Sequence, residues 1–95
     1  MTREKVFEKI STERDYQDAK WGVPMEHPHE VGGWILLIQQ HANDAAKAWS
    51  TSSNDREALE EIRKIAAIAV ACGEQYGLQS RSPYLTKNAK LRGPA

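Results

Sequence analysis

Apolar residues recur at helical spacing in two long segments of the chain. In residues 31–50, steps of three and four residues connect Ile35, Ile38, Ala42, Ala45 and Trp49. In residues 57–76, the same steps connect Leu59, Ile62, Ala66, Ala69 and Gly73. Such spacing places the apolar side chains on one face of an α-helix. Both segments are therefore predicted to be helices that pack through these faces.

A second row of residues flanks each apolar row, and it carries polar side chains. It comprises Trp34, Leu37, His41, Asp44 and Ala48 in the first segment, and Ala58, Glu61, Ile65, Ile68 and Cys72 in the second. We expect His41, Asp44 and Glu61 to point toward the line along which the two helices meet. Burying such groups unpaired costs several kcal/mol, so a partner, a metal or a ligand should compensate them.

A further helix is predicted nearer the N-terminus, over residues 2–20. Its apolar face would consist of Val6, Phe7, Ile10 and Tyr16. Glycine and proline then predict a loop over residues 21–30, and Gly32-Gly33 is expected to turn the backbone tightly into the next helix. Asn54 with Glu57 fits a capping box for the last helix, and Gly77 is expected to end it.

These elements predict an all-α fold, a small helical bundle of three main helices. Alternating β-branched runs typical of strands are lacking. A chain of 95 residues builds only a modest core, so we expect homo-oligomerisation to complete the bundle. Residues 1–77 are predicted to be the helical domain and residues 78–95 a basic tail. The sequence leaves two alternatives for that tail, a short helical turn over 84–91 or a disordered chain.

The net charge is formally zero, which gives no general attraction to nucleic acid or membranes. All 13 acidic residues but only nine of the 13 basic ones lie in 1–77, so that region carries about −4. The single cysteine, Cys72, forms no intrachain disulfide and is expected to be a small core residue. No long apolar run or signal-like N-terminus is present, so a cytoplasmic protein is expected.

Polar residues on the two central helices form a candidate site. His41 and Asp44 are three residues apart on one helix, as are Glu61 and Lys64 on the next. One interpretation is a metal site, for which the histidine favours zinc or manganese over magnesium. A second is a buried network in which Lys64 supplies the positive charge. The third is an ion-pair cluster at the solvated margin of the bundle.

Several motifs resemble the small phage-type MazG-like proteins, relatives of the all-α nucleoside triphosphate pyrophosphohydrolases. They are Glu-Arg-Asp-Tyr-Gln-Asp-Ala-Lys-Trp-Gly at 13–22, a histidine and Gly-Gly-Trp before a helix, Ala-Ala-Lys-Ala at 45–48, and Ile-Arg-Lys-Ile-Ala-Ala-Ile-Ala-Val-Ala at 62–71. The resemblance covers about residues 13–77. It implies an all-α fold and a nucleotide substrate or ligand.

In active members of that family, Glu-Glu-x-x-Glu on one helix and Glu-x-x-Asp on the next hold magnesium for hydrolysis. Aligned on Ala-Ala-Lys-Ala, the first motif falls on Gln40, His41 and Asp44, and the second on Glu61 and Lys64. Losing carboxylates and gaining a lysine weakens a magnesium site. The resemblance therefore implies a protein that binds a nucleotide. Its ordinary metal-dependent hydrolysis is expected to be lost, and no cofactor is expected.

Further residues are candidate ligand contacts. Arg14 and Gln17 share a helix face and could contact phosphate or a base edge, or cap the loop. Trp21 and Trp34 flank the loop and could stack on a base or anchor the core. The predicted ligand-binding set is Arg14, Gln17, Trp21, Trp34, Gln40, His41, Asp44, Glu61 and Lys64.

Two other groups of polar residues have simpler interpretations. His27, His29 and Glu30 have the spacing of metal ligands, but no further ligand is evident beside them. Glu74 is expected to pair with Arg81 or to lie at the rim of a pocket.

Three functions follow from the sequence. The first is non-catalytic binding of a nucleotide by a homo-oligomer, in a phage setting sequestering a cyclic-nucleotide or ADP-ribose-type defence signal in the host cytoplasm. The second is a divergent pyrophosphohydrolase using Mg²⁺ or Mn²⁺ with Asp44 and Glu61 as metal ligands and His41 as base. The third is a module that binds a host protein. Neither nucleic acid nor a membrane is an expected partner.

Overall fold

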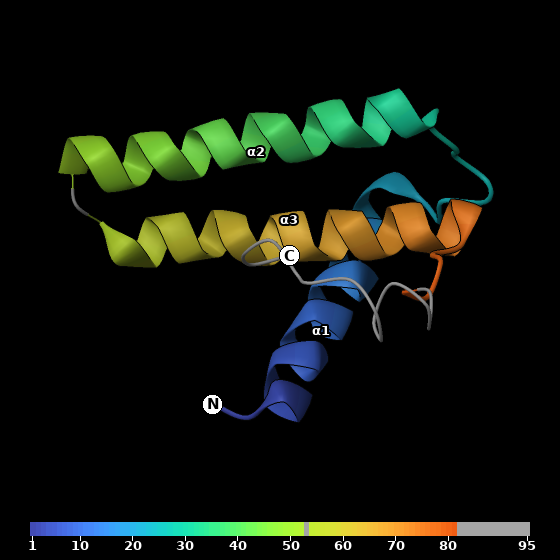
Figure 1. The fold of residues 1–95 in the computed structure, drawn as a ribbon, viewed down its shortest axis with the longest axis horizontal. Coiled ribbons are helices and arrows are strands. Elements are labelled where there is room, and N and C mark those ends of the chain that lie inside the picture. The colour runs from blue at the N-terminus through green and yellow to red at the C-terminus, as the bar shows by residue number, and fades with distance from the viewer. Residues whose placement is uncertain (53, 82–95) are drawn as a thin grey trace.

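The computed structural model describes residues 1–52 and 54–81, and within these ranges the chain is helical with no strand. The helices are α1 (Arg3–Trp21), α2 (Val31–Ser52) and α3 (Asp55–Tyr76). α2 and α3 run antiparallel side by side, and α1 packs across α3 (Figure 1). The predicted all-α bundle of three main helices is confirmed. The tail turn expected at 84–91 lies outside the described residues.

Local sequence signals set the helix ends. The Thr2 hydroxyl accepts a hydrogen bond from the Lys5 amide at 3.2 Å, and the Asn54 side chain accepts one from the Glu57 amide at 3.1 Å. These bonds satisfy amides that the first turn of a helix leaves unpaired. Gly77 ends α3 with φ of 81°, and its N–H donates to the Gly73 carbonyl at 2.7 Å. The predicted ends at Asn54 and Gly77 are confirmed.

The expected turn at Gly32-Gly33 is wrong. Both glycines lie in the first turn of α2, and the positive-φ glycines of the described chain are Gly22 and Gly77. Gly33 instead permits a close approach, because a Cβ there would lie 3.3 Å from the Cβ of His29. The bend occurs at Gly22, where φ is 88° and the loop folds back so that His27 lies against the glycine.

The contact between α2 and α3 is formed mainly by the flanking rows, and the regular row of α2 adds Ile38, which packs on the core, and the buried Ala45. Trp34, Ile68 and Ala71 form the buried core cluster, with Leu37, Ile38 and Cys72 packed against it. Cys72 is thus a partly buried packing residue, as predicted. Most of the regular rows stay outside, where Ile35 is 55% and Leu59 64% exposed. A helix has two adjacent apolar rows here, and sequence periodicity does not say which one faces the neighbouring helix.

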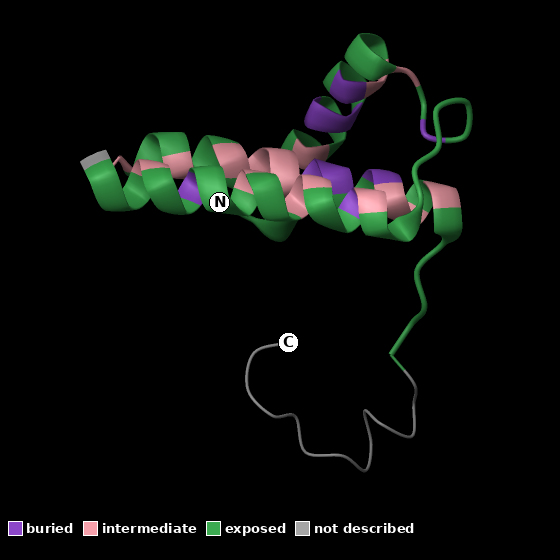
Figure 2. Ribbon diagram, turned by 90° about the horizontal axis from the view of Figure 1, so that it is seen from above, coloured by how far each residue is buried: buried purple, intermediate pink, exposed green. Residues whose placement is uncertain are grey.

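The predicted apolar face of α1 is also wrong. Val6, Phe7 and Tyr16 are exposed, whereas Glu13, Arg14 and Gln17 are buried. Figure 2 shows the buried positions of α1 in the C-terminal half of the helix, where its side chains bond to α3. The reason is that polar residues on α3 supply partners for them, so α1 docks through ion pairs and hydrogen bonds.

Within the described ranges, no helix combines the length and apolar character needed to cross a bilayer.

Replacing Gly22 should test the bend after α1. Gly22→Ala places a methyl group on the imidazole ring of His27 at a φ unfavourable to alanine, so it should destabilise the protein by roughly 1–3 kcal/mol. Gly32→Ala is the matched control, because its Cβ meets nothing within 4 Å and alanine favours helices. Urea unfolding should show a lowered midpoint for the first variant only; equal midpoints would contradict the role of the bend.

Candidate functional site

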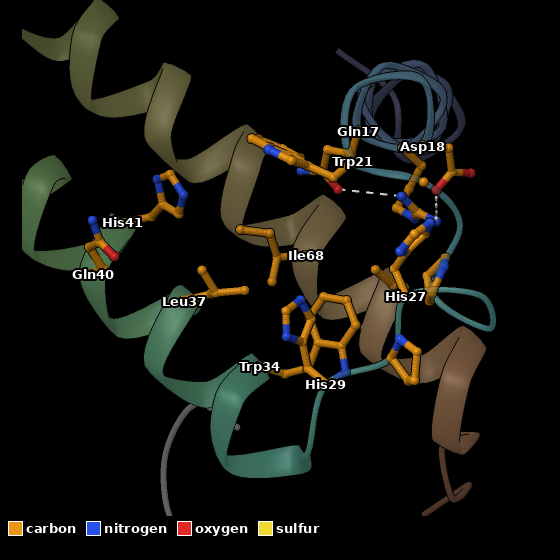
Figure 3. A pocket seen from close by; sticks show the side chains of 15 residues that line it. Gln17, Asp18, Trp21, His27, His29, Trp34, Leu37, Gln40, His41 and Ile68 are labelled. Atoms are coloured by element: carbon orange, nitrogen blue, oxygen red, sulfur yellow. Dashed lines mark hydrogen bonds and ion pairs between the residues drawn. The ribbon is translucent and has the colours of Figure 1, made fainter.

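A pocket of about 600 Å³ lies where α1, the 22–30 loop, α2 and α3 meet (Figure 3). Gln17 and Trp21 approach it from α1, His27 and His29 from the loop, and Leu37 and His41 from α2. Its complete lining is Arg14, Gln17, Asp18, Trp21, Gly22, Pro24, His27, Pro28, His29, Trp34, Leu37, Gln40, His41, Ile68 and Ala71. Apolar walls with a few polar groups are typical of small-molecule sites.

Arg14 fixes α1 against α3 at the base of the pocket. Its Nε donates to Glu74 at 2.5 Å and its Nη2 to the other Glu74 oxygen at 3.1 Å, a two-point contact. The same Nη2 donates to Asp18 at 2.7 Å. The hydrogen bond to Glu74, strengthened by Asp18, raises the pKa of Arg14 although burial opposes it. The guanidinium is thus a structural cation whose charge two carboxylates already balance.

Two further contacts complete the docking of α1. Arg63 donates to the buried Glu13 at 2.8 Å and to Glu60 at 2.6 Å, and these bonds hold the pKa of Arg63 far above its ordinary value. Gln17 donates to the Lys64 carbonyl at 3.4 Å. No buried side-chain N or O atom in the described residues lacks a hydrogen-bond partner. The polar surface of α1 is therefore compensated at every buried position.

Gln75 holds the loop and α2 together at the other side of the pocket. Its amide oxygen accepts from the His29 backbone at 3.1 Å and from the Trp34 indole at 2.9 Å, while its NH₂ donates to the His29 carbonyl at 2.7 Å. The Tyr76 hydroxyl donates to the same carbonyl at 2.8 Å. The His29 ring meets Trp34 edge-on, with centroids 4.6 Å apart. These bonds fix the wall that His29 and Trp34 form.

The two candidate tryptophans have different environments. Trp34 is buried and belongs to the core, although one edge lines the pocket. Trp21 lines the pocket as well but is 61% exposed, and the Lys20 ammonium lies 4.8 Å from its ring centroid. Lys20 forms no ion pair with the described residues. The rim therefore offers an aromatic face beside a cation that no carboxylate neutralises.

His41, Asp44 and Glu61 come together at the α2–α3 contact, at one end of the pocket. One potential metal-ligand atom from each lies within 4.8 Å of the others. His41 Nδ1 and Glu61 Oε2 are 2.6 Å apart, and Lys64 Nζ donates to the other Glu61 oxygen at 3.3 Å. His41 and Glu61 are half-buried, whereas Asp44 is exposed. Asp44 was expected to face the adjoining helix, and its exposure shows it at the margin instead.

The pKa of Glu61 follows from these contacts. Burial raises this pKa and is the largest single influence, but the hydrogen bonds from His41 and Lys64 together outweigh it, so the net pKa is lowered. The carboxylate is therefore ionised at neutral pH, and its charge is balanced by the groups beside it. Both the lysine network and a metal site would use Glu61, and in this structure Lys64 contacts one of its oxygens and His41 the other.

The pocket includes many, but not all, of the residues predicted from sequence. Arg14, Gln17, Trp21, Trp34, Gln40 and His41 line it, whereas Asp44, Glu61 and Lys64 are not in its lining. His27 and His29 join it as wall residues, and no ligand cluster forms around them in the described ranges. Glu74 pairs with Arg14. The sequence did not indicate the roles of Gln75, which holds His29 and Trp34, and of Asp18, which pairs with Arg14. A single polar residue at the margin of a helix carries no distinctive sequence signal.

Comparison with known proteins leaves the site to be judged on this geometry alone. Family models, curated proteins and solved structures were searched, and none matches the chain.

The Arg14 contact should dominate the docking of α1. Arg14→Ala leaves Asp18 and Glu74 facing each other without a cation, and we expect a loss of roughly 2–3 kcal/mol. This value is below the full cost of a broken buried pair because the Glu74 side chain is 45% exposed. Lys5→Ala is the control, since the Lys5–Glu8 pair is exposed and should change stability by less than about 1 kcal/mol. Chemical denaturation checks both; similar losses would contradict the assignment.

The lowered pKa of Glu61 predicts a specific pH dependence. Because the folded-state pKa lies below the unfolded value of about 4.3, this group stabilises the fold above that pH and ceases to do so as pH falls through the folded pKa. Glu61→Gln should therefore unfold with a shallower dependence on pH below about pH 5. Glu26→Gln, at an exposed residue without an ion pair in the described chain, should keep the wild-type slope in acid titrations followed by circular dichroism.

Proposed function

We propose that the protein binds a nucleotide-type small molecule in the pocket without hydrolysing it. The observation that carries this proposal is the exposed ring of Trp21 at the rim of a 600 Å³ pocket whose wall offers imidazole and amide groups. A nucleobase has a flat face for stacking and polar edges for hydrogen bonds. His27, Gln40 and His41 are the lining groups able to contact such edges.

The charges indicate how such a ligand would be oriented. Arg14 is already held by Glu74 and Asp18, so a phosphate would have to displace a carboxylate to reach it. Lys20 is at the rim beside Trp21 and has no ion-pair partner in the described residues. We therefore place the base against Trp21 and the phosphate next to Lys20, toward solvent. This orientation also suits cyclic nucleotides and ADP-ribose derivatives, the ligand classes that a phage protein would sequester.

The resemblance to MazG-like proteins supports the same proposal. In that family the equivalent helices carry clustered acids for magnesium, whereas this chain has Gln40, His41 and Lys64 at three of those positions. A lysine that donates to Glu61 weakens the attraction of that carboxylate for a divalent cation. Binding thus requires no cofactor in this proposal. We also propose that the chain associates with itself, because no large side chain of the described residues is fully buried.

A second function rests on the proximity of His41, Asp44 and Glu61, whose possible ligand atoms lie within 4.8 Å of one another. One imidazole and two carboxylates are a donor set for manganese or zinc. Under this alternative the protein is a metal-dependent pyrophosphohydrolase that releases a monophosphate and pyrophosphate. Turnover would then require added Mg²⁺ or Mn²⁺ and would be lost in Glu61→Gln, whereas a binding protein returns its ligand intact.

Ligand capture by the wild-type chain and two variants tests the proposal. Purified protein is incubated with purine nucleotides, cyclic nucleotides and ADP-ribose derivatives, with and without Mg²⁺ or Mn²⁺, then filtered and heat-denatured. Mass spectrometry of both fractions should find one ligand retained and released unchanged. Trp21→Ala should weaken its binding by roughly 5- to 150-fold, the loss of one stacked base.

Phe7→Ala is the matched control, because Phe7 is an exposed aromatic residue of the same helix that does not line the pocket. It should bind as the wild type does. Failure to retain any member of the panel, or equal binding by Trp21→Ala, would refute nucleotide binding at this pocket. A blank panel together with a stoichiometric host protein in a pull-down would favour the protein-interaction module instead.

A further inference from the structure

The exposed members of the two regular apolar rows form one continuous surface, whereas Ile38 and Ala45 of the α2 row turn toward the core. We call it the hairpin face and define it by Val31, Ile35, Ala42 and Trp49 of α2 with Leu59, Ile62, Ala66 and Ala69 of α3. Each row is displaced from the α2–α3 contact in the same rotational sense, at about 100° per residue. In an antiparallel pair such rows lie on the same side. The pocket residues Leu37 and Gln40 are displaced in the opposite sense, so the hairpin face lies away from the pocket.

The hairpin face is apolar and uncharged, and its large side chains remain in water. Ile62 is 52% and Trp49 is 61% exposed. None of its eight residues carries a charge. Ala42 and Ala66 lie between the larger side chains of the two rows and leave room for a neighbouring helix to approach. Monomeric proteins seldom leave large contiguous apolar patches exposed, so this surface is expected to be covered by a partner.

The composition of the face favours a second copy of this chain over other occupants. A two-fold axis pairs a patch with itself, so large residues such as Ile35 and Ile62 can pack into the alanine-lined centre of the opposite copy. An uncharged patch also brings no like charges together when it meets itself. The chain's own residues 82–95 contain Tyr84, Leu85 and Leu91 as their only large apolar residues, alongside three basic ones, too few to cover the face.

We infer that the hairpin face is the surface on which two copies of this chain dock, burying it in a dimer with a four-helix core. This inference rests on the self-association proposed above and names the surface responsible. It leaves both pockets on the outside of the dimer, because each lies on the opposite side of its α2–α3 pair. Ligand binding and dimer formation are therefore separable by mutation.

Adjacent exposed residues of α2 provide a matched pair of variants. Ile35 belongs to the face, whereas Leu36 is 65% exposed but lies outside it. Light scattering during size-exclusion chromatography should give the wild type and Leu36→Glu at least twice the mass of one chain. Ile35→Glu should have the mass of one chain, or lose helical circular dichroism because the monomer cannot fold. Either result for Ile35→Glu, with Leu36→Glu unaffected, supports the inference.

Photocross-linking tests the surface without a destabilising charge. Benzoylphenylalanine at position 62 keeps the face apolar, and irradiated mixtures of isotopically light and heavy protein should yield mixed-isotope dimers joined to residues 31–49 or 59–69. The same group at position 36 should yield none. A single-chain mass for the wild type would overturn both self-association and this surface. An oligomer that Ile35→Glu does not affect, or cross-links from position 62 to residues 82–95 of the same chain, would overturn the surface alone.

Discussion

The fold depends on one guanidinium group that joins two helices. Arg14 of α1 contacts both oxygens of Glu74 on α3 and also Asp18 on its own helix. Without this contact α1 would be held mainly by the Arg63–Glu13 pair and the Gln17 hydrogen bond, because its apolar residues Phe7 and Tyr16 are exposed. The position of α1 in turn places Trp21 and the start of the loop. A polar contact thus positions the aromatic rim of a largely apolar pocket.

The pocket is formed between elements, and no single helix contains it. Gln75 ties the loop and Trp34 to α3 on one side, and Arg14 ties α1 to α3 on the other. α3 is therefore the common support for both walls, and its residues at the pocket floor, Ile68 and Ala71, are buried. These contacts fix the walls of the pocket, while Trp21 at its rim remains 61% exposed.

Charge separates the structural part of the molecule from the part that is free to bind. The cations at the helix contacts, Arg14 and Arg63, are each paired with two carboxylates. At the rim of the pocket, Lys20 contacts the rings of Tyr16 and Trp21 and forms no ion pair within the described chain. Lys64, which the resemblance aligns with a metal-binding acid, shares Glu61 with His41. Lys64 thus places a positive charge beside the Glu61 carboxylate.

The sequence alone determined the helices, because spacing, capping residues and glycines act over a few neighbouring positions. It indicated the ends at Asn54 and Gly77, and six of the nine residues predicted to bind a ligand line the pocket. Only the tertiary structure decided which face of each helix is buried. Where two apolar rows adjoin on one helix, as at Ile35 and Trp34, the neighbouring helix decides which row is buried. In α1, burial of Arg14 depends on Glu74, sixty residues away, and local periodicity carries no information about so distant a partner.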